Sequence, residues 1–230
     1  MENSKQESIS LLEFDCRTNL LDKNYSSEKV IEIVDILFRE IIDEVTLSRG
    51  ITDYTAVNMT GRVDEFLINY DNFNTLIKTN SHYKFCKFYF LQNNQRLNLG
   101  LAFSDHEEIQ PEANDGLYTL QGFDFVKDIN FSKKRNDFVS KGGLRDIMKS
   151  YYSTTITEVV LYELEMVFIY NLAVSHSYKV EKLEFKMFKY PSIYEKDPKK
   201  ENRISFAVNP VLTGLNSTQT KSFDAGDLKP

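Results

Sequence analysis

The sequence predicts an α+β fold in which a single antiparallel sheet is covered by two or three helices, with extended polar arms at both ends. Three observations lead to this prediction. One long segment carries apolar residues at helical spacing, and several shorter segments have the aromatic or alternating pattern of strands. The two kinds of segment do not alternate regularly along the chain, which disfavours a doubly wound parallel sheet. We divide the chain into an arm (1–25), one α+β domain (26–212) and a second arm (213–230).

The first expected element is a helix over residues 27–48. Ser26 and Ser27 are suitable N-caps, and Arg49 with Gly50 is typical of a helix end. Its apolar residues recur at steps of three or four: Val30, Val34, Leu37, Ile41 and Val45.

A second helix is predicted over 62–78, although four Asn and Asp residues between 69 and 74 weaken it, because such side chains compete with helical hydrogen bonds. Its expected apolar face consists of Val63, Phe66, Leu67, Tyr70, Phe73 and Ile77.

The middle of the chain reads as strands. Residues 83–91 and 96–103 are rich in aromatic and aliphatic side chains and predict a β-hairpin with a four-residue loop, Gln92–Gln95. A polar loop over 104–116 follows, and 117–126 is expected to form another strand.

The second half begins with Gly142-Gly143 and a short expected helix, 144–152. No Gly or Pro interrupts residues 151–190, so their division is inferred from the pattern alone. We expect a helix over 156–174, a turn at 175–177 and a strand over 178–190. The alternative makes 156–174 a strand, because β-branched residues are frequent there. A last strand, 203–208, is expected to end at the turn Asn209-Pro210.

Several classes of protein are disfavoured. The longest apolar stretch is interrupted by Glu163 and Glu165, so no membrane insertion is expected. Residues 1–10 are polar and do not resemble a secretion signal. Cys16 and Cys86 cannot build a disulfide framework, which fits a cytoplasmic protein.

No cofactor, metal or catalytic site is predicted, because no nucleotide-binding, zinc or nucleophile motif is present. Residues 105–108 (Asp-His-Glu-Glu) contain metal-ligand side chains, but adjacent loop residues seldom converge, and a solvated loop is the preferred interpretation. The carboxylates Glu163 and Glu165 would share a face on a strand and diverge on a helix.

The charge distribution is uneven within a formal net charge of −6. Residues 1–65 carry 7 basic and 14 acidic side chains, whereas residues 127–200 carry 14 and 10. Opposed charges favour docking between copies or onto another protein. The triplet Lys133, Lys134 and Arg135 is the centre of the basic region, yet the overall charge disfavours nucleic acid as a partner.

These observations favour a non-enzymatic structural or interaction subunit of a larger assembly, binding copies of itself or other proteins. The arm 213–230 carries three spaced apolar anchors, Leu215, Phe223 and Leu228, which suit docking into a groove or onto a sheet edge. The abundance of Asn, Lys, Ile, Phe and Tyr suggests an AT-rich gene, so a bacteriophage virion or contractile-injection component is the specific hypothesis.

Two alternatives stay open. One is a small enzyme or effector whose site forms only in three dimensions, which requires a pocket containing at least two residues among Asp105, His106, Glu163, Glu165 and His176. The other is a weak nucleic-acid-binding protein, which requires the basic side chains of 127–149 on one face.

Overall fold

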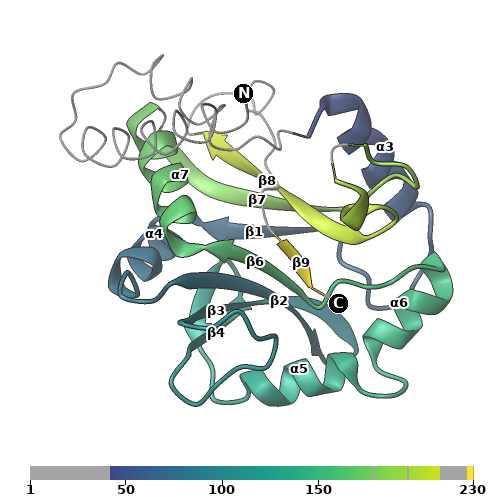
Figure 1. The fold of residues 1–230 in the computed structure, drawn as a ribbon, viewed down its shortest axis with the longest axis horizontal. Coiled ribbons are helices and arrows are strands. Elements are labelled where there is room, and N and C mark those ends of the chain that lie inside the picture. The colour runs from purple at the N-terminus through teal and green to yellow at the C-terminus, as the bar shows by residue number, and fades with distance from the viewer. Residues whose placement is uncertain (1–41, 178, 196, 213–226, 230) are drawn as a thin grey trace, which may run out of the picture.

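The computed structural model describes residues 42–177, 179–195, 197–212 and 227–229 (Figure 1). Helices and antiparallel strands make up this part of the chain, so the predicted α+β class is confirmed. The elements are, in chain order, α3 (Glu44–Thr55), β1 (Glu65–Asn69), α4 (Tyr70–Thr79), β2 (Phe85–Asn93), β3 (Arg96–Ser104), β4 (Gly116–Gln121), β5 (Asp124–Lys127), α5 (Phe131–Val139), α6 (Leu144–Tyr152), β6 (Val159–Glu163), α7 (Leu164–Ser177), β7 (Val180–Lys189), the 3₁₀ turn η1 (Pro198–Lys200), β8 (Ile204–Leu212) and β9 (Asp227–Lys229).

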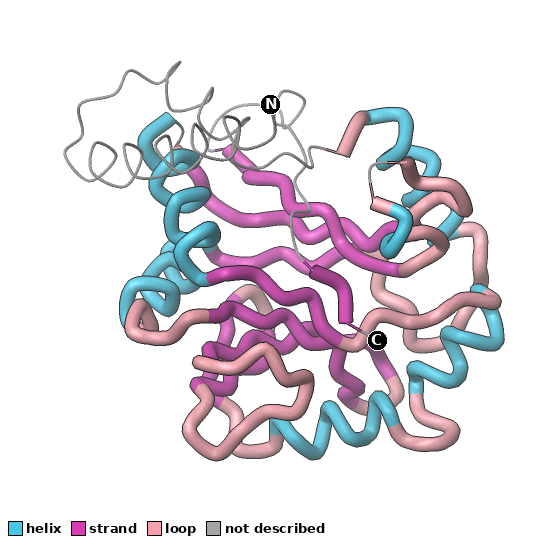
Figure 2. Tube along the Cα trace, viewed as in Figure 1, coloured by secondary structure: helices cyan, strands magenta, loops and turns pink. Residues whose placement is uncertain are grey.

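The strands form two sheets, so the prediction of a single sheet is wrong. One sheet has the order β1-β7-β8, the other β5-β4-β3-β2-β6-β9, and every neighbouring pair is antiparallel. Figure 2 shows the strands in the centre of the molecule with the helices around them. The need for a second sheet is explained by β2, whose six residues from Cys86 to Leu91 are all buried. Both faces of that strand need a cover, and a single sheet with helices on one face would leave the other in water.

Aromatic side chains connect the two sheets across the main core. Phe88 on β2 lies 5.2 Å from Phe185 on β7 and 5.4 Å from Phe206 on β8, measured between ring centroids. Phe185 and Phe206 are themselves 4.8 Å apart. Rings at these separations interact favourably beyond the area they bury. Cys86, a free and fully buried thiol on the same strand, belongs to this core.

The two sheets also approach each other at both sides of this core. The amide of Asn69, at the end of β1, donates to the carbonyl of Phe123 in the β4–β5 turn over 2.7 Å. On the other side Ile156, just before β6, forms an isolated parallel bridge with Ile204 of β8. The sheets therefore wrap around one hydrophobic core.

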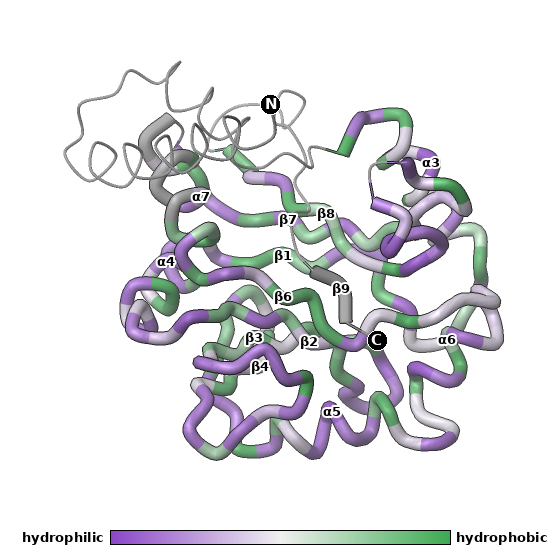
Figure 3. Tube along the Cα trace, viewed as in Figure 1, coloured by the Kyte–Doolittle hydropathy of each residue, from purple (hydrophilic) through white to green (hydrophobic). Residues whose placement is uncertain are grey.

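Helix α5 covers the opposite face of the six-stranded sheet. Phe131 at the start of α5 packs on Tyr89, Leu91 and Ala102 in a second, smaller apolar cluster. The Phe131 and Tyr89 rings meet edge to face at 5.2 Å. Figure 3 shows the hydrophobic colouring of β6 and the largely hydrophilic colouring of α5, whose apolar residues are confined to the inner side. This helix was not predicted, because its run of polar residues resembled a loop.

Residues 27–41 of the predicted helix 27–48 lie outside the described residues. For residues 42–48 the prediction of one continuous helix is wrong. Asp43 is extended and caps a new helix, α3, by accepting a hydrogen bond from the amide of Thr46 at 2.8 Å. Gly50 does not end a helix but lies inside α3. A Cβ atom there would stand 2.6 Å from the carbonyl oxygen of Lys189, so the glycine lets α3 approach β7 closely.

The predicted helix 62–78 is a strand followed by a helix. β1 ends at Asn69, whose side chain accepts hydrogen bonds from the amides of Asp71 and Asn72 and so caps α4. The Asn and Asp residues that weakened the prediction are thus the signal that starts the helix.

The segment 156–174 combines the two alternatives considered for it. Strand β6 forms early in the segment and contains Val159 and Val160, and α7 begins immediately afterwards at Leu164. The helix also contains β-branched residues, Val167 and Ile169 among them, so these residues do not mark the boundary. Helix α7 continues to Ser177, so the turn predicted at 175–177 is wrong, whereas the strand predicted over 178–190 is confirmed by β7.

The predicted hairpin is confirmed, with Asn94 and Gln95 as a two-residue turn rather than a four-residue loop. Residues 117–126 form two strands, not one, with Gly122 at positive φ between them. The predicted helix 144–152 is α6. β8 runs through Asn209 and Pro210, so no turn occurs there, because both residues remain paired with β7.

Candidate functional sites

The first candidate site is the outer edge of β6. One edge of this strand pairs with β2, and β9 pairs with the other edge over three residues. Val160 lies opposite Leu228 in that register, and Val159 and Leu161 lie opposite Lys229 and Asp227. The three acceptor residues of β6 are between 0 and 7 % exposed. Of the predicted anchors, Leu228 is therefore placed on a sheet edge, while Leu215 and Phe223 lie outside the described residues.

The second candidate is a pocket of about 550 Å³ where α4, β2, β6 and α7 meet. The chain reverses from β6 into α7 between Glu163 and Leu164, so that Glu163 ends the strand and Glu165 lies in the first helical turn. Both carboxylates line the pocket. The other lining residues are Ile77, Ser81, Tyr83, Lys84, Phe85, Leu164 and Phe168.

This pocket has an apolar interior and a charged rim. Leu164 is buried, and its amide donates to the carbonyl of Lys84 over 2.8 Å, which fixes the start of α7 beside β2. The charged side chains at Lys84, Glu163 and Glu165 belong to exposed residues. Two of the five residues named for a three-dimensional site are thus brought together, while neither His106 nor Asp105 lines this pocket.

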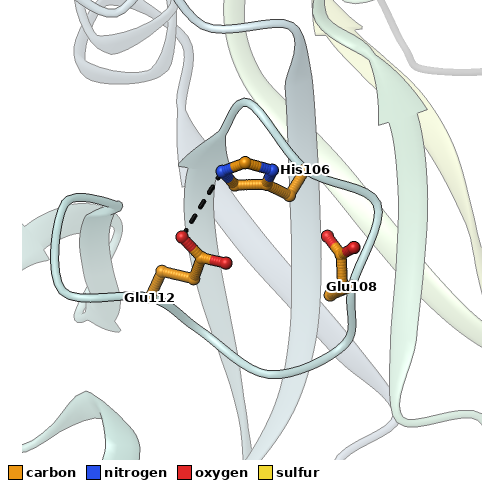
Figure 4. Close-up of side chains that lie close together, drawn as sticks. All are labelled: His106, Glu108 and Glu112. Carbon is orange, nitrogen blue, oxygen red and sulfur yellow. Dashed lines mark ion pairs between the residues drawn. The ribbon is translucent and has the colours of Figure 1, made fainter.

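The third candidate is the loop between β3 and β4, where His106, Glu108 and Glu112 converge (Figure 4). Their ligand atoms all lie within 4.8 Å of one another, and the three residues are exposed. The Nε2 atom of His106 is 3.4 Å from a carboxylate oxygen of Glu112. Residues 105–108 were recognisable in the sequence as side chains of metal-ligand type, whereas Glu112 was not associated with them, because no periodic pattern indicates that the chain returns after Pro111.

A buried lysine fastens this loop to the sheet. Lys87 on β2 is 1 % exposed, and its ammonium group donates to the carbonyl of Glu108 over 2.9 Å. Burial lowers the pKa of Lys87, and the nearby carboxylates, Asp115 first among them, oppose that shift. At the other side of the loop the amide of Glu112 donates to Asp115 over 2.9 Å.

The predicted basic triplet does not form one face. Consecutive helical residues point about 100° apart, so the three side chains of α5 diverge. Lys133 is exposed and pairs with Asp137, and Lys134 turns back to Asp128 at 2.7 Å. Arg135 is 4 % exposed, and its guanidinium group contacts Glu158 at 3.3 Å.

Arg145 also contacts Glu158, so one carboxylate receives two guanidinium groups. Gln110 completes this network by accepting a hydrogen bond from Arg135 over 2.9 Å. Through Glu158, Arg135 and Arg145 hold α5, α6 and the segment before β6 together.

None of the helices in the described part of the chain is both long and apolar enough to cross a membrane. No protein-family model, curated protein or solved structure matches the chain.

Proposed function

We propose that this chain is a non-enzymatic interaction subunit whose copies are joined by exchange of strand β9 onto the β6 edge. The observation that carries the proposal is the antiparallel pairing of Asp227–Lys229 with Val159–Leu161. An unpaired strand edge offers a row of amide and carbonyl groups to any extended segment, and main-chain hydrogen bonds supply the affinity.

The acceptor edge suits an exchange. Val159, Val160 and Leu161 of β6 are buried and apolar, so removal of β9 would leave the backbone amide and carbonyl groups at this edge unpaired beside the core. β9 pairs over only three residues, and a strand of that length contributes few hydrogen bonds. The same three residues from another copy would make identical contacts, so the energetic difference between the two arrangements is small.

The connection to β9 has enough length for this exchange. Fourteen residues, 213–226, separate Leu212 at the end of β8 from Asp227 at the start of β9. A fully extended chain covers about 3.3–3.6 Å per residue, so this segment spans up to about 50 Å. That span exceeds the diameter of a small domain, about 30 Å, which allows β9 to reach a neighbouring copy.

The test compares the full chain with a chain that lacks residues 213–230, using sedimentation over a range of concentrations. We expect the full chain to form dimers or larger species and the truncated chain to remain monomeric, with the same far-ultraviolet circular dichroism. A peptide of residues 221–230 in excess should dissociate the assemblies of the full chain. A full chain that is monomeric at all concentrations, or a truncated chain that assembles equally well, contradicts the proposal.

A matched control separates the strand from the segment before it. In this variant residues 213–226 are replaced by a Gly/Ser sequence of the same length, and β9 is retained. Assembly equal to that of the wild type assigns the interaction to β9, whereas its loss assigns it to Leu215 or Phe223. The specific setting that we propose, a bacteriophage virion or contractile-injection complex, rests on the composition alone and is tested by recovery of the chain in purified particles.

The pocket at the β6–α7 junction favours a second candidate function, the binding of a small molecule. Its volume of about 550 Å³ lies in the range of ligand sites, which are mostly apolar with a few polar groups. Two carboxylates and one ammonium group give its rim a net negative charge, so an organic cation with an apolar body is the ligand class that fits.

This second candidate is tested with a pair of probes of the same shape, phenethylamine and phenylpropionate, by following chemical shifts of the pocket residues. We expect the amine to bind and the acid not to bind. The variants Glu163→Gln and Glu165→Gln should weaken binding of the amine, while Glu181→Gln, on an exposed position of β7, serves as a control. Equal binding of the amine and the acid would contradict the charge argument.

A further inference from the structure

We propose that His106, Glu108 and Glu112 form a binding site for one divalent transition-metal ion of the zinc class. The three side chains come from a single loop and face a common point from different sides, as Figure 4 shows. This site is independent of the β6 edge, so the proposal stands or falls separately from strand exchange.

The distances fit coordination. Zinc lies about 2.0–2.2 Å from imidazole nitrogen and carboxylate oxygen atoms, so two ligand atoms at a tetrahedral angle are separated by about 3.4 Å. Nε2 of His106 and the carboxylate oxygen of Glu112 are 3.4 Å apart. Glu108 is within 4.8 Å of both, and a side-chain rotation at this exposed residue closes the remaining gap.

The identity of the donors selects the class of ion. An imidazole nitrogen with two carboxylate oxygens is typical of zinc and its neighbours in the periodic table, whereas calcium and magnesium prefer oxygen donors alone. The imidazole also distinguishes this site from the carboxylate clusters common on exposed loops. Three protein ligands leave a fourth position open to solvent.

The surroundings favour a cation at this position. Residues 105–116 include five acidic side chains and no lysine or arginine. Their negative potential attracts cations. The loop is also held in place before any ion arrives. Lys87 binds the Glu108 carbonyl, the His106 amide donates to the Ser104 hydroxyl over 3.2 Å, and Asp115 accepts from the Glu112 amide. A preorganised loop loses less conformational entropy when it binds an ion.

The test is isothermal titration calorimetry of the full chain, freed of metal and titrated at neutral pH with zinc chloride and, separately, with magnesium chloride. We expect one zinc ion per chain with micromolar affinity and much weaker binding of magnesium. Because removal of even an outer-shell partner of a metal site costs about 10–100-fold in affinity, His106→Gln and Glu112→Gln should each weaken zinc binding at least about tenfold.

The matched control is His82→Gln, which removes an exposed histidine outside the loop. This variant should bind zinc as the wild type does. Zinc binding weaker than about 1 mM in the wild type, or equal affinity in the wild type and His106→Gln, would overturn the proposal. Circular dichroism of each variant verifies that the fold is retained, which the exposure of all three ligands leads us to expect.

Discussion

Asp128 illustrates how a single charged residue stabilises the connection between β5 and α5. Its carboxylate accepts hydrogen bonds from the hydroxyl of Thr119 and the ammonium group of Lys134, both at 2.7 Å, and its side chain is only 8 % exposed. Burial acts to raise the pKa of Asp128, but the hydrogen bonds from Lys134, Thr119 and the Asn130 amide outweigh it, and the pKa is lowered.

This lowered pKa predicts a pH-dependent contribution to stability. A carboxyl group whose pKa is depressed by folding stabilises the native state above its unfolded pKa, and this contribution is lost as the pH falls through the folded value. Asp128→Asn should therefore lower the free energy of unfolding by about 1–3 kcal/mol at pH 7, and the difference from the wild type should shrink towards pH 2. Urea denaturation across this pH range measures both effects.

Asp137→Asn is the control for this prediction. It removes the ion pair between Asp137 and Lys133, whose side chains are 43 % and 73 % exposed, respectively. Such exposed pairs contribute about 0.5 kcal/mol or less to the free energy of unfolding. A pH-independent deficit in Asp128→Asn would show that the charge of the carboxylate is not what stabilises this connection.

At the scale of elements, two tight turns each contain a glycine with positive φ, and the two glycines differ in their surroundings. Gly61 has φ +82°, and a Cβ atom there would lie 2.1 Å from the carbonyl oxygen of Gln95 in the β2–β3 hairpin turn. Gly122 has φ +63° in the β4–β5 turn, and nothing lies within 4 Å of its expected Cβ position.

The two glycines give a matched pair of substitutions. Gly122→Ala should cost about 1–2 kcal/mol, the price of a left-handed backbone for a residue with a Cβ. Gly61→Ala should cost at least about 1–2 kcal/mol more, because the methyl group also forces the hairpin turn away from the segment before β1. Equal destabilisation of the two variants in urea denaturation would mean that the hairpin turn moves to accommodate the methyl group at position 61 without a loss of stability.

The elements also show how far local pattern determines this fold. The β2–β3 hairpin, α6 and β7 were predicted, because their apolar residues pair or pack in the way their spacing indicates. The junction at Glu163 was not, since apolar residues are frequent both before and after it and no Gly or Pro separates the strand from the helix. A strand that passes directly into a helix is decided by tertiary pairing with β2.

The candidate sites depend on contacts that the sequence does not encode locally. Glu163 and Glu165 share a pocket only because the chain changes from strand to helix between them. The loop that brings Glu112 to His106 is fastened at Glu108 by Lys87, a residue 21 positions earlier in the sequence. Conversely, the sequence suggested that Lys133, Lys134 and Arg135 form an exposed basic patch. Arg135 is instead buried, where it pairs with Glu158, a residue distant in the sequence.

At the scale of the whole molecule, both sheets belong to one hydrophobic core, which is centred on Phe88. The rings of Phe73, Phe125, Tyr162, Phe185 and Phe206 all lie within 6.3 Å of its centroid. These neighbours come from both sheets and α4. Loss of this ring would therefore leave a cavity between the two layers.

Phe88→Ala should lower the free energy of unfolding by about 3–5 kcal/mol, a large part of the 5–15 kcal/mol typical of a domain. Because one core connects the sheets, the variant should still unfold in a single transition, with coincident far-ultraviolet and near-ultraviolet signals in urea. Ile129→Ala, at a residue that is 97 % exposed, should change stability by about 0.5 kcal/mol or less. Two separate transitions would show that the layers are held independently.

The position of Cys86 turns the centre of the six-stranded sheet into a chemical reporter. Its thiol is fully buried on β2 between Phe103 of β3 and Tyr162 of β6, and burial raises its pKa, so almost no reactive thiolate is available in the native state. Alkylation in a Cys16→Ser background should proceed only when these three strands separate, at a rate that follows global unfolding. Release of β9 uncovers the far edge of β6 and leaves Cys86 protected. The rate at which isotopically labelled and unlabelled copies mix measures subunit exchange, and the rate of Cys86 alkylation measures unfolding. Fast mixing with slow alkylation would then show that copies exchange β9 without unfolding.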